Sequence, residues 1–193
     1  MKQKQLLVAA FAATLVFSAP VLAQQVKFAA DAEFYSLDDS GCVSSYIFLF
    51  VRNGRTIESR ENARARLEMT ILRTDECQNE ILLEARARTN LRDGEVSFDP
   101  QLGNTNLDTT VQMVDRQSRN PINADVVVNW AAVDEPVTLD ARFEVEAPGQ
   151  IVRRARPVAT TLRLAEAFGT ISVDGGPNLV PDTSTDAAIT SSR

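Results

Sequence analysis

The chain has 193 residues, with 26 acidic and 20 basic side chains and a formal net charge of −6 at pH 7. This acidic balance argues against nucleic acid or an anionic membrane surface as the main partner, because both require a positive field. The sequence contains no histidine, which removes the usual general base at neutral pH, His-assisted serine and cysteine hydrolases, and His-ligated zinc or copper.

Residues 1–23 have the pattern of a secretory signal peptide. Lys2 and Lys4 precede an apolar run at 6–17, and residues 21–23 (VLA) suit a cleavage site. The apolar run is about 12 residues, shorter than the roughly 20 that cross a bilayer, and no later segment is apolar enough to do so. We therefore expect an exported protein, periplasmic or extracellular, with a mature chain that begins at Gln24. Cleavage would change the net charge from −6 to −8.

The mature chain opens with a candidate strand at 24–35 and a turn at 36–41 (SLDDSG). Its densest apolar run follows at 42–53 (CVSSYIFLFVRN). Residues 46–51 are apolar at every position, which predicts a strand with both faces covered. A short buried helix is the alternative, but the β-branched and aromatic content favours a strand.

Cys42 and Cys77 are the only cysteines. In an oxidising compartment an even pair is most simply one disulfide. The loop that it would close should stabilise the fold by roughly 3–4 kcal/mol on the chain-entropy account. A structural role is expected, because cysteine redox catalysis usually uses a close pair such as C-x-x-C.

The disulfide constrains how the strand at 42–53 finds its partner. Asn53-Gly54 has the sequence of a two-residue hairpin turn, but a hairpin there would leave Cys77 too far from Cys42 for Cα atoms that must lie within about 7 Å. We therefore predict a long loop at 52–62 and an antiparallel return at 63–73. The apolar and polar residues of 63–73 alternate, as in a half-buried strand; a helix is the alternative for this alanine- and arginine-rich segment.

A turn at 74–80 then leads to a second alternating strand at 81–89. A hairpin centred on the second cysteine would place Arg66 opposite Arg88 and Glu68 opposite Arg86. It would also gather four arginines on a solvent face, the one local arginine cluster worth naming as a candidate site: Arg64, Arg66, Arg86 and Arg88.

This arginine face has two interpretations. As a binding face it would suit carboxylates or sulfates, because guanidinium groups form bidentate hydrogen bonds with them. The simpler interpretation is a solvated face that Glu68 and Glu84 partly neutralise. The abundance of arginine in the whole chain is itself typical of a GC-rich genome.

The rest of the chain alternates between turn signals and short strands. Trp130, the only tryptophan, is expected in the core. The clearest alternation is at 137–146, where Val137 and Leu139 belong to the predicted dry face. The remaining predicted strands are at 95–98, 109–115, 125–133, 158–164 and 169–173.

The pattern predicts an all-β fold: a single antiparallel β-sandwich of about eight to ten strands, with barrel-like closure as the alternative. An immunoglobulin arrangement does not fit, because it places tryptophan between two cysteines, whereas Trp130 follows both. We assign 1–23 to the signal peptide, 24–173 to the β domain, and 174–193 to a polar, loose tail. That tail contains one candidate last strand, at 187–190.

No catalytic motif stands out. The chain has no P-loop lysine motif and no G-x-G-x-x-G, and its 26 acids offer too many carboxylate pairs to single one out. No cofactor is expected, with calcium kept as a weak alternative at Asp38-Asp39 and at Asn104, Asn106 and Asp108. Turn-forming polar residues explain both groups more simply, because neither has the glycine and distant acid of an EF-hand loop.

Short motifs in the C-terminal third carry a family resemblance. They are Val128-Asn129-Trp130, Pro148-Gly149, Arg163, Gly169, Asp174-Gly175, Asn178-Leu179 and Pro181-Asp182. Together they resemble an uncharacterised family of exported, disulfide-bearing, β-rich bacterial proteins with no assigned activity. The resemblance implies a bacterial exported protein and no functional residue.

The expected function is therefore a non-catalytic one, in which an exported β domain acts by surface interaction with a protein or a cell-envelope component. The alternative is a carbohydrate-binding or carbohydrate-active protein that uses the arginine face. This alternative needs an aromatic platform for sugar stacking, for which Trp130, Tyr35 and Tyr46 are the candidates. Nothing in the sequence specifies an oligomeric state.

Overall fold

The computed structural model describes residues 26–53, 65–141, 158–181 and 183–192. The expected signal peptide and Arg64 lie outside these residues. Ten strands are present in the described part: β1 Lys27–Leu37, β2 Val43–Arg52, β3 Arg66–Asp75, β4 Glu80–Asn90, β5 Val96–Phe98, β6 Asn104–Asp115, β7 Pro121–Ala132, β8 Val137–Ala141, β9 Val158–Val173 and β10 Asp186–Ser192.

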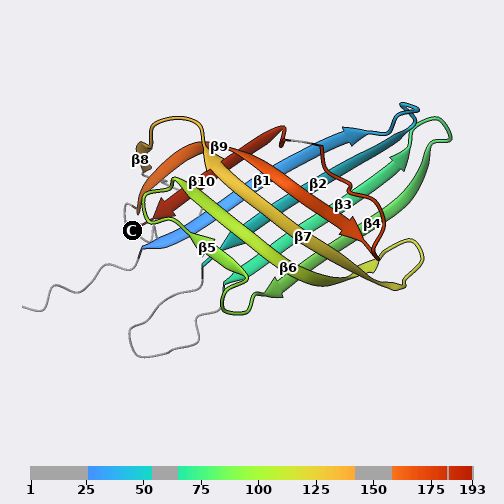
Figure 1. Cartoon of the computed structure of the whole chain (residues 1–193), viewed down its shortest axis with the longest axis horizontal. Coiled ribbons are helices and arrows are strands. Elements are labelled where there is room, and N and C mark those ends of the chain that lie inside the picture. Colours follow the sequence, from blue (N-terminus) through green and yellow to red (C-terminus); the bar gives the residue numbers. More distant parts are fainter. Residues whose placement is uncertain (1–25, 54–64, 142–157, 182, 193) are drawn as a thin grey trace, which may run out of the picture.

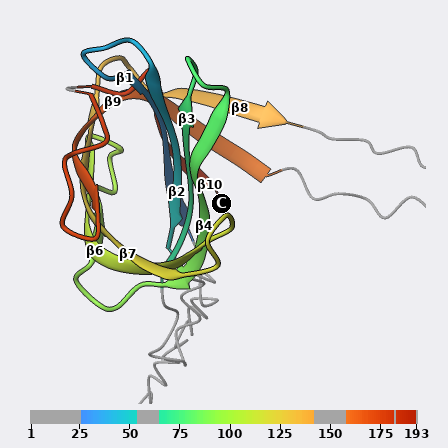
Figure 2. The same ribbon diagram turned by 90° about the vertical axis from the view of Figure 1, so that its right-hand side faces the viewer.

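The strands form one antiparallel sheet that curls into a ring. Its order is β10-β1-β2-β3-β4-β6-β7-β9-β8, and β10 also pairs with β9, which closes the circuit. The ring is flattened, with β1 to β4 facing β6, β7 and β9 across the core (Figure 1, Figure 2). The predicted all-β antiparallel fold is confirmed, and the two facing walls belong to a single continuous sheet.

Alternating side chains fill the inside of this ring. On β2, Ile47, Leu49 and Val51 are fully buried, as expected from the apolar run. Trp130 on β7 is also fully buried, and its Nε1 donates a hydrogen bond of 2.7 Å to the carbonyl oxygen of Asp31 on the opposite wall. The predicted core position of the tryptophan is therefore confirmed, with its polar atom satisfied as burial requires.

The disulfide and the pairing inferred from it are both present. Cys42 and Cys77 are joined with a Cα–Cα distance of 5.2 Å, and β2 pairs with β3 in antiparallel register from Val43 opposite Asp75 to Arg52 opposite Arg66. A tight hairpin at Asn53 is thus excluded. The predicted return at 63–73 begins, in the described residues, with β3 at Arg66.

The register between β3 and β4 differs from the prediction by two positions. Glu68 faces Arg88 and not Arg86, while Arg66 faces Asn90. The cause is local: the turn occupies 76–79, with Asn79 at a φ of 53°, and the register shifts between Arg73 and Thr74. A bulge of this kind adds a residue to one strand only, so a symmetric hairpin centred on Cys77 could not anticipate it.

Two predicted strands, at 158–164 and 169–173, are one continuous 16-residue strand, β9. Gly169 does not break it. At this residue φ is +151°, and a Cβ atom would lie 2.0 Å from the carbonyl oxygen of Val127 on β7. The glycine is there because β7 and β9 approach too closely for any side chain.

The segment expected to be a loose tail contains β10. The candidate strand at 187–190 is extended to Asp186–Ser192, and it pairs with both β1 and β9. Ala187 and Ile189 are buried in the core. The polar composition of 174–193 therefore concealed a strand that contributes only a few apolar side chains but closes the ring.

The dry face predicted for 137–146 is not observed. Val137 is 51% exposed and Leu139 49% exposed, because β8 is the last strand of the sheet order and pairs only with β9, beyond the β9–β10 pairing that closes the ring. The remainder of that prediction, from residue 142, falls outside the described residues. No helix in the described ranges is long and apolar enough to cross a membrane.

Candidate functional site

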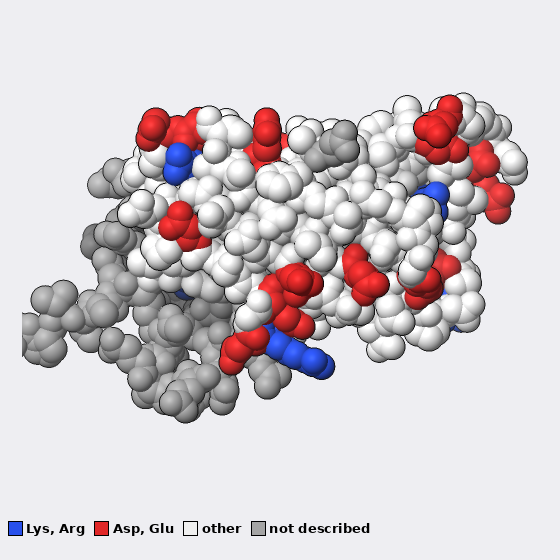
Figure 3. Space-filling model, in the orientation of Figure 1, with Lys and Arg blue, Asp and Glu red and all other residues white. Residues whose placement is uncertain are grey.

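Basic side chains are concentrated on one wall of the ring. Among the described strands, β1 to β4 carry Lys27, Arg52, Arg66, Arg73, Arg86 and Arg88, whereas β5 to β10 carry only Arg163. Figure 3 shows the other wall, where acidic side chains are scattered and few basic ones appear. Each of these two groups of strands also carries six acidic residues, so β1 to β4 are balanced in charge while β5 to β10 are acidic.

The predicted arginine face is divided in the structure. Arg88 forms an ion pair of 3.0 Å with Glu68, and Glu84 instead forms one of 2.8 Å with Arg116. Glu68 therefore neutralises Arg88, as the simpler interpretation required. Arg66 belongs to a different environment, at the end of the ring away from the disulfide.

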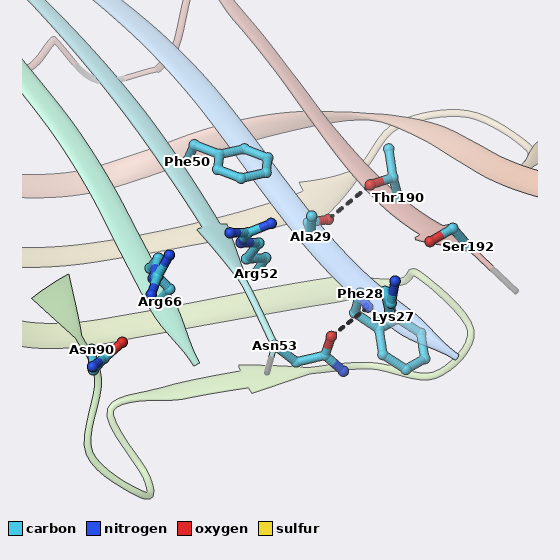
Figure 4. Close-up of a pocket in the computed structure, with 10 residues that line it drawn as sticks. All are labelled: Lys27, Phe28, Ala29, Phe50, Arg52, Asn53, Arg66, Asn90, Thr190 and Ser192. Carbon is cyan, nitrogen blue, oxygen red and sulfur yellow. Dashed lines mark hydrogen bonds between the residues drawn. The ribbon is translucent and has the colours of Figure 1, made fainter. Parts of the chain in front are cut away.

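A groove of about 510 Å³ lies on the outer face at that end, with Arg66 in its wall. Its lining contains three cations, one outward-facing phenylalanine and several neutral hydrogen-bonding groups, but no acidic residue (Figure 4). The lining residues are Lys27, Phe28, Ala29, Phe50, Arg52, Asn53, Arg66, Asn90, Thr190 and Ser192.

The central feature of this groove is a pair of like charges. Arg52 lies directly opposite Arg66 in the β2–β3 register, and Figure 4 shows the two side chains next to each other. Neither of the two ion pairs found between described residues involves them or Lys27. Like charges at directly opposed positions destabilise a sheet, and a bound anion would remove that repulsion.

Phe50 adds an apolar surface to the cationic one. It is the last of three outward-facing aromatic residues on β2, with Tyr46 and Phe48, and all three are only partly exposed. The expectation that both faces of this strand are covered is therefore met fully on the inner face and only in part on the outer one. The aromatic row leads along β2 into the groove.

Part of the groove lining is held in place by hydrogen bonds between the start of β1 and the end of β2. The amide of Phe28 donates to Asn53 Oδ1 at 2.8 Å, and the amide of Asn53 donates to the carbonyl of Phe28 at 2.9 Å. The Phe28 ring also stacks on Phe98, with centroids 6.1 Å apart. Such fixed geometry lowers the entropic cost of binding.

An acidic group borders the groove on β1 and β10. Asp31 has a raised pKa because it is partly buried and lies near Asp186 and Glu33. Burial and the nearby Glu33 also raise the pKa of Tyr46. The charge of the outer surface thus changes from positive to negative within one strand spacing of Phe50, since Asp31 pairs with Phe50.

Sequence reasoning missed two of the three cations. The sequence prediction places Arg52 in a loop, and Lys27 is an isolated residue near the start of the predicted mature chain. The disulfide could have led to Arg52: it predicts the antiparallel return at 63–73, and extending the preceding strand by one residue, from 51 to 52, places Arg52 opposite Arg66.

The two calcium candidates have different structural explanations. Asp38 belongs to the turn, where its carboxylate accepts hydrogen bonds from the amides of Val43 and Cys42 and the hydroxyl of Ser40; these bonds, led by that from Val43, lower its pKa. Asn104, Asn106 and Asp108 are instead alternate, exposed positions of β6 and not turn residues. The described residues include no group of three or more histidine, cysteine, aspartate or glutamate side chains placed to hold a metal ion.

No family model matches this sequence, and no curated protein or solved structure matches it either. The geometry and chemistry of the groove are therefore the basis for assigning a function.

Proposed function

We propose that this chain is an exported, non-catalytic protein that acts by surface interaction, and that its cationic groove binds an acidic segment of a protein or cell-envelope partner. The observation that carries the proposal is the Arg52–Arg66 pair, opposed across two strands in a groove without an acidic lining residue. Arginine and aromatic residues are also the types enriched at interfaces.

Export is supported by the leader pattern and by the disulfide, which is consistent with an oxidising compartment. The expected compartment is the periplasm or the extracellular space. Intact-mass analysis of the protein recovered from these fractions should give a chain that begins at Gln24. A chain that retains residues 1–23 would contradict this part of the proposal.

A non-catalytic role is supported by the chemistry of the groove. The sequence has no histidine, and the lining offers neither a carboxylate nor a cysteine. Thr190 and Ser192 contribute hydroxyls, but a hydroxyl nucleophile needs a neighbouring base to be activated. Cations and hydrogen-bond donors without a base suit binding better than bond cleavage.

The groove can be tested by calorimetric titration of the mature protein with a short polyglutamate peptide at low salt. The Arg52→Gln/Arg66→Gln variant should lose affinity by about tenfold or more, because hydrogen bonds to charged groups contribute about 1.5–3 kcal/mol each. The matched control is Arg86→Gln/Arg119→Gln, which removes the same charge outside the groove. Equal losses in both variants, or no binding by the unaltered protein, would overturn the proposal.

An acidic carbohydrate is the second candidate ligand, and Phe50 is the observation that favours it. Trp130 is buried and cannot stack on a sugar, but Tyr35 is 47% exposed and Phe50 lies within the groove. Titration with an oligogalacturonate, and with a neutral oligosaccharide of the same length, separates this ligand from polyglutamate. Phe50→Leu should weaken oligogalacturonate binding selectively if the ring provides the platform.

A further inference from the structure

A second pocket lies at the opposite end of the ring, beside the disulfide. Its volume is about 480 Å³, within the range of roughly 300–1,000 Å³ that is usual for small-molecule sites. Two stretches of the chain form its outer walls, the end of β1 with its turn and the segment 177–181. Ser45 and Arg73, from the neighbouring strands β2 and β3, line its inner side.

Arg73 is the unusual member of this lining. It follows Leu67, Met69 and Ile71 in the inward-facing positions of β3, all three of which are buried. Its Nε atom is buried and has no hydrogen-bond partner among the described residues, and it takes part in neither of the observed ion pairs. A buried donor without a partner costs about 1–3 kcal/mol, and more when it is charged, so its retention calls for an acceptor.

The other lining residues define what kind of acceptor fits. Most are apolar: Leu37, Val43, Pro177, Leu179, Val180 and Pro181. Ser45, directly opposite Arg73 in the sheet, is only 6% exposed and adds one hydroxyl. A single guanidinium among apolar walls suits a ligand that has one oxyanion and an apolar body.

Charge at the pocket mouth narrows the choice to a monoanion. Asp38 and Asp39 are also lining residues, and both are exposed. The Asp38 carboxylate is already engaged by the amides of its own turn. Two carboxylates near one guanidinium would repel a polyanion, whereas a single carboxylate placed on Arg73 is still attracted at short range.

Hydrogen bonds and the disulfide hold the walls of this pocket in place before any ligand binds. The Ser36 hydroxyl donates to the carbonyl of Leu179 at 2.9 Å, and the amide of Leu179 donates to the carbonyl of Ile171 at 2.8 Å. On the other side the disulfide holds Cys42, whose carbonyl accepts from the amide of Glu76 at 2.7 Å. The pocket therefore does not have to be ordered when a ligand enters.

We propose that this pocket binds a small monocarboxylate with an apolar body, the carboxylate resting on the Arg73 guanidinium. Such a carboxylate can belong to a free organic acid or to the C-terminus of a peptide that ends in an apolar residue. The site is independent of the cationic groove, which lies at the other end of the ring and has a different charge balance.

Calorimetric titration of the mature protein with decanoate, below its micelle concentration, tests this proposal. One molecule should bind per chain, and Arg73→Met should weaken binding at least tenfold. Arg86→Met, which removes an exposed arginine outside both the groove and this pocket, is the matched control and should leave decanoate affinity unchanged. Decan-1-ol, which has the same chain but no charge, should bind much more weakly than decanoate.

The source of the carboxylate is distinguished by a tripeptide that ends in leucine, titrated with a free and with an amidated C-terminus. Binding of the free form alone points to a peptide terminus, and preference for decanoate points to a free acid. Amide chemical shifts locate the site without any substitution: Val43, Ser45 and Val180 should move, and Arg52 should not. The proposal would be overturned if decanoate and decan-1-ol bound with equal affinity, or if the Arg73→Met variant bound decanoate as well as the unaltered protein does. Chemical-shift changes confined to the groove, or no binding of either carboxylate, would also overturn it.

Discussion

Asp31 is partly buried on the outer face of β1, and burial together with Asp186 and Glu33 raises its pKa. An acid whose pKa is raised on folding opposes folding when it is ionised. This opposition is complete above the folded-state pKa and disappears as the pH falls below the unfolded-state value of about 3.8. The Asp31 carboxylate is therefore a source of instability at neutral pH.

Asp31→Asn should accordingly raise the melting temperature at pH 7.5, because the amide is neutral. The gain should shrink towards zero at pH 3.5, where the original carboxyl is largely protonated. Thermal unfolding at both pH values measures this, with Asp93→Asn in an exposed turn as the control. A gain that is the same at both pH values would mean that charge is not its cause.

Gly169→Ala should destabilise the fold strongly. A methyl group there would meet the carbonyl oxygen of Val127 at 2.0 Å, in a backbone conformation that only glycine adopts readily. The expected loss is on the order of 2–4 kcal/mol, measured by urea unfolding. Gly41→Ala is the matched control: its φ is +71° with nothing within 4 Å, so it should lose only about 1–2 kcal/mol.

Single residues were predictable where one property determines the position. Trp130 is large and apolar, and it is buried as expected. Arg52 and Arg73 were not predictable in this way, because their roles depend on which residue lies opposite and which face of the strand they occupy. Both became apparent only from the register of β2 and β3.

At the scale of elements, the disulfide connects the turn after β1 to the turn after β3. Replacing both cysteines with serine should lower the free energy of unfolding by roughly 3–4 kcal/mol, the value for a loop of this length. Urea unfolding with and without reductant measures it.

The same cysteine variant should also weaken decanoate binding, because Cys42 anchors one wall of the Arg73 pocket. Binding of polyglutamate at the other end of the ring should be unaffected as long as the variant is folded. Loss of binding to both decanoate and polyglutamate would instead indicate general unfolding.

The alternation of apolar and polar residues predicts which face of a strand is apolar, but it predicts less well which element packs against that face. The alternation of 109–115 and 125–133 is real, although β6 and β7 begin earlier, at Asn104 and Pro121. The alternation of β8 is equally clear, yet Val137 and Leu139 remain half exposed. Period-two patterning shows that a strand has an apolar face, but it does not show whether another element covers that face.

For the whole molecule, the wall made by β5 to β10 is acidic, whereas the wall made by β1 to β4 is balanced in charge and gathers three cations in the groove. Because the groove is exposed and its proposed ligand carries several charges, polyglutamate affinity should fall steeply between 50 and 300 mM NaCl. Decanoate carries one charge and buries an apolar chain, so its affinity should change little. Parallel titrations at the two salt concentrations measure the difference; an equal salt dependence would mean that both ligands occupy one site.

The fold class was accessible from sequence, but the ring closure could only be kept as an alternative. Closure depends on the pairing of β1 with β10, whose residues come from opposite ends of the described chain. Local patterns carry no information about such a distant pairing. The few apolar side chains of β10 also made its segment resemble a loose tail.

The pairing of β1 with β10 also determines when the sheet can close. If the chain crosses a membrane from its N-terminus, β1 emerges first and must wait with an unpaired edge until β10 has followed. An open edge is the part of a sheet that recruits foreign strands, and contacts between distant residues form slowly. If the protein is exported as proposed, aggregation is therefore most favoured during the interval when the ring lacks only its last strand.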